Sequence, residues 1–569
     1  MSVSRKCLLL CIFCLITIPV FSQGTYLELN LNEPSMRGSF NISQQKSPLD
    51  IFRVIEKAAE DKKINGIILN IGNFSANREY YWELRNSLEY FKSGGKKVCA
   101  FISNADIDLY CLASAADKIV MDELGTLTIM GYVMGRGYAK HALEKLGIGV
   151  RELRYLEYKS AAETFTRDSM SDADRRQYSE YLDDIFNETR STLLNARSFT
   201  GEEFDTILNG EFLYSAKSAK NRKLIDYIGR KDAVIKAINE LEEKEVKSFY
   251  LFGDSMSSIT GSKTNYVLTE AGGLFSKPPV IAIVYANGQT DMESGMGAWN
   301  LAKIVRELAD NKRVKAIVLR INSPGGSAEA ADYLDAAVRY AKQKMPVVVS
   351  MGEVAASGGY WAAMNATHIA ASPYTITGSI GVIGTWFYDN GLNAKLGLNT
   401  DIIQRGAHAD LLTGILVPYR NLSPQEEGRY REYILDLYGM FVEKVAAGRF
   451  MEVEKAESVA QGRIFSGVKA QEAGLIDSIG GLSDAIRIAR SLANVSEVDV
   501  IYREYPKLSF MEKLLSRSPL AGLFLGKNNS DAIGFFSELV FPFKREDIRY
   551  RLEKNGQILT ILPLEFSVF

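Results

Sequence analysis

The stretch INGIILNIGN, residues 64–73, returns as VKAIVLRINS, residues 314–323, at a separation of 250 residues. A second pair keeps nearly the same offset, because KLIDYIG at residues 223–229 returns as GLIDSIG at residues 474–480. Two distant blocks with a common spacing indicate an internal tandem duplication. INGIILNI and VKAIVLRI are short apolar runs rich in Ile, Val and Leu, which is typical of fully buried strands. We therefore expect two copies of one fold.

Longer stretches with helical spacing alternate with these apolar runs. One spans residues 328–343, between VKAIVLRI and the apolar run MPVVVSM at residues 345–351. Two more helices are predicted at residues 171–196 and 423–447, each with a Ser at its N-cap and acidic residues in its first turn. Continuously apolar strands with helices between them predict parallel sheets covered on both faces. The predicted fold class is α/β, in two similar lobes.

The chain of 569 residues is too long for one hydrophobic core, and its 46% hydrophobic and 24% charged residues are ordinary for a globular protein. Its composition shifts suggest five segments. These are a leader at 1–22, a first lobe at 23–246, a Ser- and Gly-rich linker at 247–278, a second lobe at 279–495 and a tail at 496–569 without a match in the first copy.

The leader begins with Arg5 and Lys6 and continues as an apolar run of 15 residues from Cys7 to Phe21. This run is shorter than the roughly 20 residues that span a bilayer, which favours a cleaved signal peptide over a permanent anchor and leaves both open. The tail contains AIGFFSELVFPF, residues 532–543, which is also too short to span a bilayer. We expect this stretch to pack on protein or at a membrane interface.

Charge and the content of Cys and His argue against a nucleic-acid-binding protein and against a metalloprotein. With 67 Lys and Arg against 69 Asp and Glu, the net charge of −2 gives no excess positive charge for nucleic acid. Cys99 and Cys111 are the cysteines outside the leader, and both are predicted to be buried free thiols. Three scattered His and two separated Cys form no recognisable ligand set, so we predict no metal and no other cofactor.

Two stretches of the second copy carry residue types that suit catalysis. NSPGGSAEAAD, residues 322–332, places Pro-Gly-Gly at a strand end, where backbone N–H groups can hold an oxyanion. In SMGEVAASGGYW, residues 350–361, Ser357 precedes two glycines at the start of a helix, where we expect an exposed side chain with room for a peptide alongside. Taken alone, the first stretch is a turn ahead of a helix and the second a helix-capping Ser.

Together, these two stretches, TGSIG at residues 377–381 and the lysine motif EYKSAAETFTRDSMS at residues 157–171 resemble protease IV, the signal peptide peptidase A family, in its long, tandem-duplicated form. The resemblance covers roughly residues 46–493. It implies two lobes of the crotonase and Clp-protease type, built from repeated β-β-α units. It also implies a membrane-associated serine endopeptidase on the periplasmic face of the inner membrane. Such an enzyme would form a homotetramer and hydrolyse signal-peptide remnants and other short or unfolded chains.

The resemblance assigns Ser357 as the nucleophile and Lys159 as the general base, with Ser379 orienting the lysine amine. It implies oxyanion N–H groups from Gly325, Gly326 and Gly358. Sliding back by 250 residues from Ser357 leads to Ile107, so the first copy has no nucleophile there. No Lys stands opposite the lysine motif in residues 404–410 of the second copy. Each copy therefore contains only one of the two implied catalytic residues.

A lysine base must be uncharged, whereas free Lys has a pKa of about 10.4. Burial disfavours the charged form, and a shift of the pKa to about 7 to 8 would cost roughly 3 to 5 kcal/mol of folding free energy. A carboxylate paired with the amine, such as that of Glu157, would raise the pKa and disable the base.

Three alternatives stay open from the sequence. A Ser-His scheme of the Clp type has three candidate histidines, His141, His368 and His408, of which only His408 lies in the loop opposite the lysine motif. The chain could instead be a non-catalytic peptide-binding scaffold at the membrane. Acyl-CoA chemistry on a crotonase-like fold is the third possibility. If the chain is a peptidase, a pocket near Tyr360 and Trp361 would suit small or apolar residues at the cleavage point.

Overall fold

The computed structural model describes residues 25–32, 47–72, 74–268, 277–496, 499–506 and 558–561. The predicted leader and the apolar stretch at residues 532–543 lie outside these ranges. Within the ranges, no helix is both long enough and apolar enough to cross a membrane.

The first half of the chain forms a seven-stranded sheet with the strand order β6-β4-β3-β2-β1-β8, and β7 pairs with β4. All of its pairings are parallel except that of β6 with β4. The strands are β1 (Thr25–Asn30), β2 (Ile64–Asn70), β3 (Lys97–Ala105), β4 (Lys118–Thr128), β6 (Leu213–Ser215), β7 (Tyr227–Ile228) and β8 (Ser248–Phe252).

The second half forms an eight-stranded sheet with the order β16-β14-β12-β10-β9-β18, and β13 pairs with β12 and β17. All of its pairings are parallel except that of β16 with β14. The strands are β9 (Val280–Asn287), β10 (Val314–Ser323), β12 (Val347–Ala356), β13 (His368–Ala371), β14 (Ile376–Gly378), β16 (Ile464–Phe465), β17 (Ser478–Ile479) and β18 (Ile501–Tyr505). Two sheets with matching strand order confirm the predicted α/β class and its duplication.

Each sheet has an outermost strand that lies beyond the predicted boundary of its lobe. β8 pairs in parallel with β1, and β18 pairs in the same way with β9. The predicted linker therefore begins with a strand of the first sheet, and the tail begins with that strand's counterpart. Their sequences, SFYLF and IYREY, have no identical residue at the same position, so only the pairing reveals the relationship.

Helices cover both sheets, and the two predicted long helices are confirmed as α6 (Asp172–Arg197) and α14 (Pro424–Arg449). Ser171 and Ser423 cap them, as predicted, by accepting backbone N–H groups of the first turn. The other helices of the first half are α1 (Pro48–Glu60), α2 (Arg78–Ser93), α3 (Ile107–Ala113), α4 (Lys140–Leu146), α5 (Glu163–Thr166), α7 (Gly201–Leu208), α8 (Ala216–Asn221) and α9 (Lys231–Glu242). Those of the second half are α10 (Ala298–Asp310), α11 (Ala328–Lys342), α12 (Gly358–Ala363), α13 (Leu392–Leu396), α15 (Val453–Ser458), α16 (Gly467–Glu472) and α17 (Leu482–Leu492).

The cysteines outside the leader lie in the first lobe. Cys99 in β3 and Cys111 in α3 are free and buried, as predicted.

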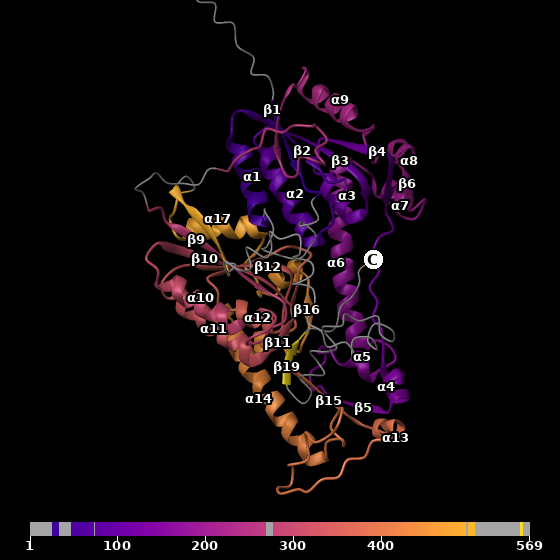
Figure 1. Ribbon diagram of the computed structural model, residues 1–569, viewed down its shortest axis with the longest axis vertical. Coiled ribbons are helices and arrows are strands. Elements are labelled where there is room, and N and C mark those ends of the chain that lie inside the picture. Colours follow the sequence, from indigo (N-terminus) through magenta and orange to yellow (C-terminus); the bar gives the residue numbers. More distant parts are fainter. Residues whose placement is uncertain are drawn as a thin grey trace, which may run out of the picture.

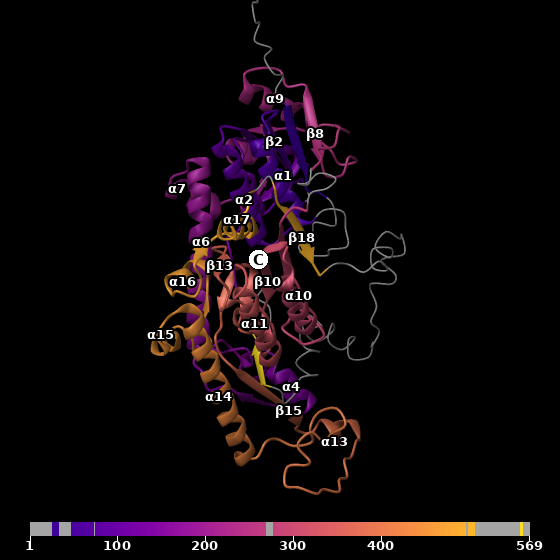
Figure 2. The same ribbon diagram turned by 90° about the vertical axis from the view of Figure 1, so that its left-hand side faces the viewer.

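A third, four-stranded sheet with the order β11-β19-β15-β5 joins the two lobes. Its strands are β11 (Gly325–Ser327), β19 (Ile558–Ile561), β15 (Ile383–Asp389) and β5 (Ile148–Leu153). β5 comes from the first half of the chain and runs antiparallel to β15 of the second. In Figure 1, β5, α4 and α5 of the first half accordingly lie low in the molecule near β15, away from the first sheet, and Figure 2 shows α4 and β15 together again.

Charged side chains also hold the lobes together. Arg320 on β10 lies 2.7 Å from Glu83 on α2 and also pairs with Glu79, and all three side chains are buried. Burial raises the pKa of Glu83, whereas the Arg320 guanidinium lowers it. Removing one partner of such a buried pair typically costs about 3–5 kcal/mol, so this contact helps to set the position of one lobe on the other.

Candidate active site

Ser357 lies between the end of β12 and the start of α12, with φ 57° and ψ −115°. This backbone conformation is sparsely populated for a residue with a side chain. The Ser357 N–H group donates to the carbonyl oxygen of Gly378 at 2.8 Å, which holds the turn in place. The side chain is 0% exposed, whereas the sequence predicted an exposed Ser. The prediction is wrong because the turn that carries Lys159, from the other lobe, packs over it.

Lys159 stands on the turn between β5 and α5 and is 1% exposed. Its Nζ lies 2.7 Å from Ser357 Oγ, 2.8 Å from the carbonyl oxygen of Ser379 and 3.0 Å from Ser379 Oγ. Ser379 has a positive φ of 50°, which turns both of its oxygens toward the amine. The structure thus brings together the three residues that the resemblance named as nucleophile, base and orienting group.

A turn at residues 461–463 binds both sides of this site. The carbonyl of Gln461 accepts the N–H of the residue before Lys159 at 2.9 Å, and the carbonyl of Arg463 accepts the N–H of Ser379 at 2.7 Å. Gly462, between them, has φ 79°, and an added Cβ would lie 2.6 Å from Lys159 Cβ. Sequence reasoning missed Gly462, although a glycine close to a strand is a signal for close backbone approach.

Two buried carboxylates flank the lysine turn. Asp174 on α6 is 0% exposed and accepts hydrogen bonds from Ser160 Oγ and from Arg136 Nη1, the latter at 2.8 Å. Burial raises the pKa of Asp174, while the charge of Arg136 and the Ser160 hydroxyl counteract the shift. The sequence had placed acidic residues here only as partners of the helix dipole, so this role of Asp174 was missed.

Glu163, at the start of α5, is the second buried carboxylate. It accepts from the N–H of Ser171 at 3.0 Å and from Arg154 at 2.6 Å. Burial acts to raise the pKa of Glu163, but these hydrogen bonds outweigh it and hold the pKa below its usual range. Glu157, which would have disabled a lysine base by pairing with it, is exposed and lies 3.7 Å from Arg176 instead.

The predicted oxyanion glycines precede and follow Ser357 along the chain. Gly325 and Gly326 belong to β11, a short strand rather than a simple turn, which pairs antiparallel with β19. Gly325 has φ 100° and donates its N–H to Ser323 Oγ at 3.2 Å. A Cβ on Gly326 would lie 2.3 Å from the carbonyl oxygen of Thr290, so only glycine fits there. Gly358 directly follows the Ser and opens α12.

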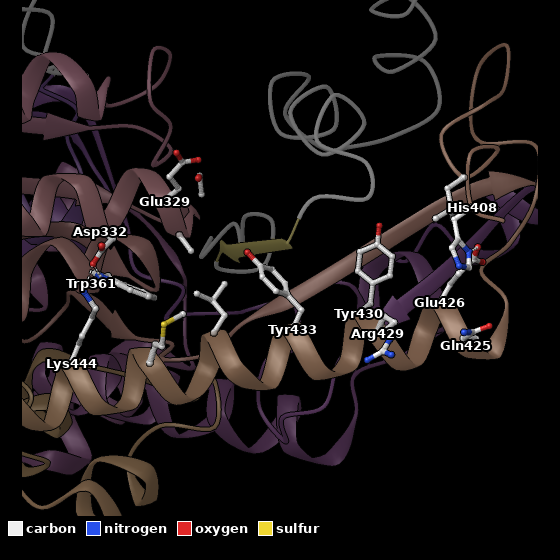
Figure 3. Close-up of a pocket in the computed structure, with 15 residues that line it drawn as sticks. Glu329, Asp332, Trp361, His408, Gln425, Glu426, Arg429, Tyr430, Tyr433 and Lys444 are labelled. Carbon is white, nitrogen blue, oxygen red and sulfur yellow. Dashed lines mark hydrogen bonds and ion pairs between the residues drawn. The ribbon is translucent and has the colours of Figure 1, made fainter. Parts of the chain in front are cut away.

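A groove of about 820 Å³ runs from β11 and α12 along α14 (Figure 3). Trp361 lines it, whereas Tyr360 is fully buried and donates its hydroxyl to the carbonyl of Leu475 at 2.9 Å. Of the two aromatic residues predicted near a pocket, Trp361 lines this groove and Tyr360 does not. The groove is lined by Ser327, Ala328, Glu329, Asp332, Trp361, His408, Leu411, Gln425, Glu426, Arg429, Tyr430, Tyr433, Leu437, Met440 and Lys444.

The three histidines have other partners. His141 lies 2.8 Å from Glu144, His368 lies 2.8 Å from Ser478 Oγ, and His408 lies 2.7 Å from Glu426. Among the described residues, none of them hydrogen-bonds to Ser357. The same part of the chain contains no group of three or more His, Cys, Asp or Glu side chains arranged to hold a metal ion.

Comparison with known proteins finds a family model that matches both halves of the chain. The family model "Peptidase family S49" matches residues 90–247 and 339–496, once in each half. The chloroplastic serine protease SPPA of Arabidopsis thaliana is 32% identical over 448 residues, which are 77% of this chain and 64% of that protein, slightly under two thirds of its length. Protease 4 of Salmonella typhi is 31% identical over 81% of this chain and 74% of its own. A putative signal peptide peptidase SppA of Enterococcus faecium is 31% identical over 42% of this chain and 70% of its own.

Proposed function

The chain belongs to peptidase family S49 and is a serine peptidase, and we propose that it works through a Ser/Lys dyad, with Ser357 as nucleophile and Lys159 as general base. The observation that carries this proposal is the 2.7 Å between Lys159 Nζ and Ser357 Oγ, in a site closed to solvent. Burial disfavours a charged amine, and the three hydrogen bonds of Nζ given above go to oxygens of uncharged Ser residues.

In the proposed reaction the neutral Lys159 amine accepts the Ser357 proton while Oγ attacks the carbonyl carbon of the scissile peptide bond. The resulting ammonium then gives this proton to the leaving amine, and an acyl-enzyme remains on Ser357. Water, deprotonated by the same amine, hydrolyses the ester. Ser379 would orient the amine through both of its oxygens. N–H groups at Gly326 and Gly358 would stabilise the oxyanion, and the N–H of Gly325 would join them on leaving Ser323 Oγ.

We propose that substrates bind as extended chains beside β11, in the position that β19 occupies in this structure. Support comes from β19, which lies between β11 and β15 in antiparallel register with Gly325–Ser327 and Ile383–Gly384. The edge next to the proposed oxyanion glycines can therefore pair with a strand, and main-chain pairing is a general way to bind peptides of varied sequence. The groove at Trp361 would then receive side chains of the bound peptide.

The test is hydrolysis of casein and of a fluorogenic peptide by purified variants. Ser357→Ala and Lys159→Met should each lose at least about a thousandfold in kcat/KM. Ser379→Ala should lose about tenfold to a hundredfold, because the Ser379 carbonyl still binds the amine. A Lys159→Met enzyme with normal activity would eliminate the dyad.

His408→Ala separates the dyad from a Ser-His scheme. The His408 side chain is half-exposed and bonded to Glu426, so we expect this variant to retain wild-type activity. Inactive His408→Ala with active Lys159→Met would support the Ser-His alternative. A wild-type protein that binds peptides without hydrolysing them would favour the scaffold. Binding of acyl-CoA thioesters would favour the acyl-CoA alternative.

We also propose that the peptidase acts at the membrane, on the periplasmic face, on signal-peptide remnants and other short or unfolded chains. Support comes from the targeting character of residues 1–22 and from the relative named as a putative signal peptide peptidase. Fractionation of cells that express the full chain tests the location. Incubation with a synthetic apolar signal peptide and with a folded globular protein tests the substrate, since only the first should be cleaved.

We propose that copies of the chain assemble into a homotetramer. The internal contact of β5 with β15 has a counterpart at the same offset of 250 residues, namely residues 398–403 of the second lobe and 133–139 of the first, which do not pair with each other in the described structure. Both regions carry exposed apolar side chains, with Val133 56% and Ile403 92% exposed. A head-to-tail contact between two copies would cover them in the way β5 and β15 cover each other.

Light scattering after size exclusion tests the assembly. Ile403→Asp should lower the mass toward that of one chain, because a charge would be buried in the contact. Met256→Asp is the matched control, since Met256 is 93% exposed and lies outside both regions. A wild-type protein that runs as a single chain would contradict the proposal.

A further inference from the structure

We propose that Arg136 is a positioning residue for catalysis: its charge balances the buried carboxylates that flank the turn of Lys159, so that these carboxylates do not hold the lysine in its protonated form. This inference rests on the proposed Ser/Lys dyad. It assigns a role to a side chain that touches neither Ser357 nor the lysine amine through any of its hydrogen bonds described above.

Arg136 contacts the lysine turn and both carboxylates through one nitrogen. Its Nη1 lies 2.8 Å from Asp174 Oδ2, 3.9 Å from Glu163 Oε2 and 3.2 Å from the carbonyl oxygen of Ser160. The Arg136 side chain is 1% exposed and both carboxylates are 0% exposed. Ser160 is the residue directly after Lys159, so the charge pair is built into the turn that carries the base.

The other charged groups near the lysine turn pair among themselves, so the charge of Asp174 is balanced by Arg136. Arg154 pairs with Glu163 at 2.6 Å and also with Glu152, whose pKa is raised by burial and lowered by Arg154 and Arg167. Glu157 pairs with Arg176 at the surface. From the second lobe, the partners of Nζ are the uncharged Ser357 and Ser379, and Arg463 on the adjoining turn pairs with Glu180.

A carboxylate close to an amine favours the ammonium form, and the effect is strong where water does not screen it. With Arg136 in place, the negative charge of Asp174 is cancelled at short range. Without it, the Lys159 amine would hold its proton to higher pH, and the acidic limb of the kcat/KM profile would move up. Removing the Asp174 charge alone would leave Arg136 unbalanced and move the limb down.

The experiment measures kcat/KM against pH with a fluorogenic peptide, together with thermal unfolding of each variant. Arg136→Met should move the acidic limb up by about one pH unit, which is about a tenfold loss of kcat/KM on that limb. Asp174→Asn should move it down. The double variant Arg136→Met with Asp174→Asn, and the conservative variant Arg136→Lys, should lie near wild type, because both keep the charges balanced.

Arg222→Met is the matched control, since it removes a surface arginine of the same lobe that pairs with Glu211 and not with the lysine motif, and it should leave the profile in place. An unchanged acidic limb in the folded Arg136→Met and Asp174→Asn variants would overturn the role of Arg136 while leaving the dyad intact. If Arg136→Met does not fold, a downward shift in Asp174→Asn supports the inference and no shift overturns it. Full activity of Lys159→Met in the same assay would instead defeat the dyad itself.

Discussion

Residues 140–171 and residues 392–423 occupy corresponding places in the two copies, since each segment leads into a long helix, α6 or α14. The first segment contains β5 and lies against the other lobe, where Lys159 is 1% exposed. The second contains α13 and a loop in which Ile403 is 92% and Leu412 74% exposed. The duplication gave both halves the same segment, and docking on a neighbouring lobe determines which of the two can bury a lysine base.

The sequences of the two segments differ in a way that matches their different environments. Residues 148–153, IGVREL, form β5 against β15, whereas their counterparts at residues 398–403, LNTDII, form no strand in the described structure. A strand edge needs a partner for its backbone groups, and among the described residues only the first segment has a strand as its partner. Variants of the two segments therefore provide direct tests of this comparison.

The largest effect is expected from Lys159→Arg. The guanidinium retains the positive charge and never becomes a base at neutral pH, so kcat/KM should fall at least about a thousandfold. The matched control in the second segment is Arg405→Ala, on an exposed side chain, which should leave kcat/KM within about twofold of wild type. An active Lys159→Arg enzyme would show that the buried amine is not the base.

Gly462→Ala should have the next largest effect, with a loss of about a hundredfold. The new Cβ would stand 2.6 Å from Lys159 Cβ, so the lysine turn must shift away from Ser357. The control is Gly428→Ala in α14, where a Cβ meets nothing within 4 Å and helix propensity improves by up to about 1 kcal/mol. Equal kinetics in the two variants would contradict the close fit at Gly462.

A smaller effect is expected from Phe165→Ala, which weakens the docking of the first segment. Phe165 is 6% exposed and packs edge-on against Phe387 of β15, with ring centroids 5.3 Å apart. Losing this contact should destabilise the protein by about 3 kcal/mol and lower kcat/KM about tenfold. Denaturant unfolding and peptide hydrolysis measure the two effects. Unchanged stability would show that this cross-lobe contact contributes little.

The smallest effect on the reaction is expected from Leu412→Ser in the second segment. Leu412 is 74% exposed, so the substitution should change the free energy of unfolding by less than about 0.5 kcal/mol and leave kcat/KM near wild type. Unfolding and hydrolysis assays run beside Phe165→Ala provide the comparison. A large loss of activity would mean that the second segment also contributes to a reaction site, against the asymmetry described here.

The fold and most of the candidate site could be predicted because their signals are local. Apolar runs located β2 and β10, and Ser at the N-cap with acidic residues after it located α6 and α14. The strands β8 and β18 lie beyond the predicted lobes, and their correspondence could not be predicted because they share no residue pattern and are related only by pairing. Arg136, Asp174 and Gly462 were missed for a similar reason, because their importance lies in contacts with Lys159 and its turn.

By itself, the sequence determined the duplication, the α/β class and the motifs around Ser357 and Lys159, since repeats, periodicity and short motifs are written along the chain. The tertiary structure decided that these two residues, 198 positions apart, meet at hydrogen-bonding distance. It also decided that Ser357 is buried and that a buried Arg136–Asp174 pair stands beside the lysine. These facts depend on β5 reaching β15 across the lobe boundary, and a contact between distant strands leaves no local pattern in either one.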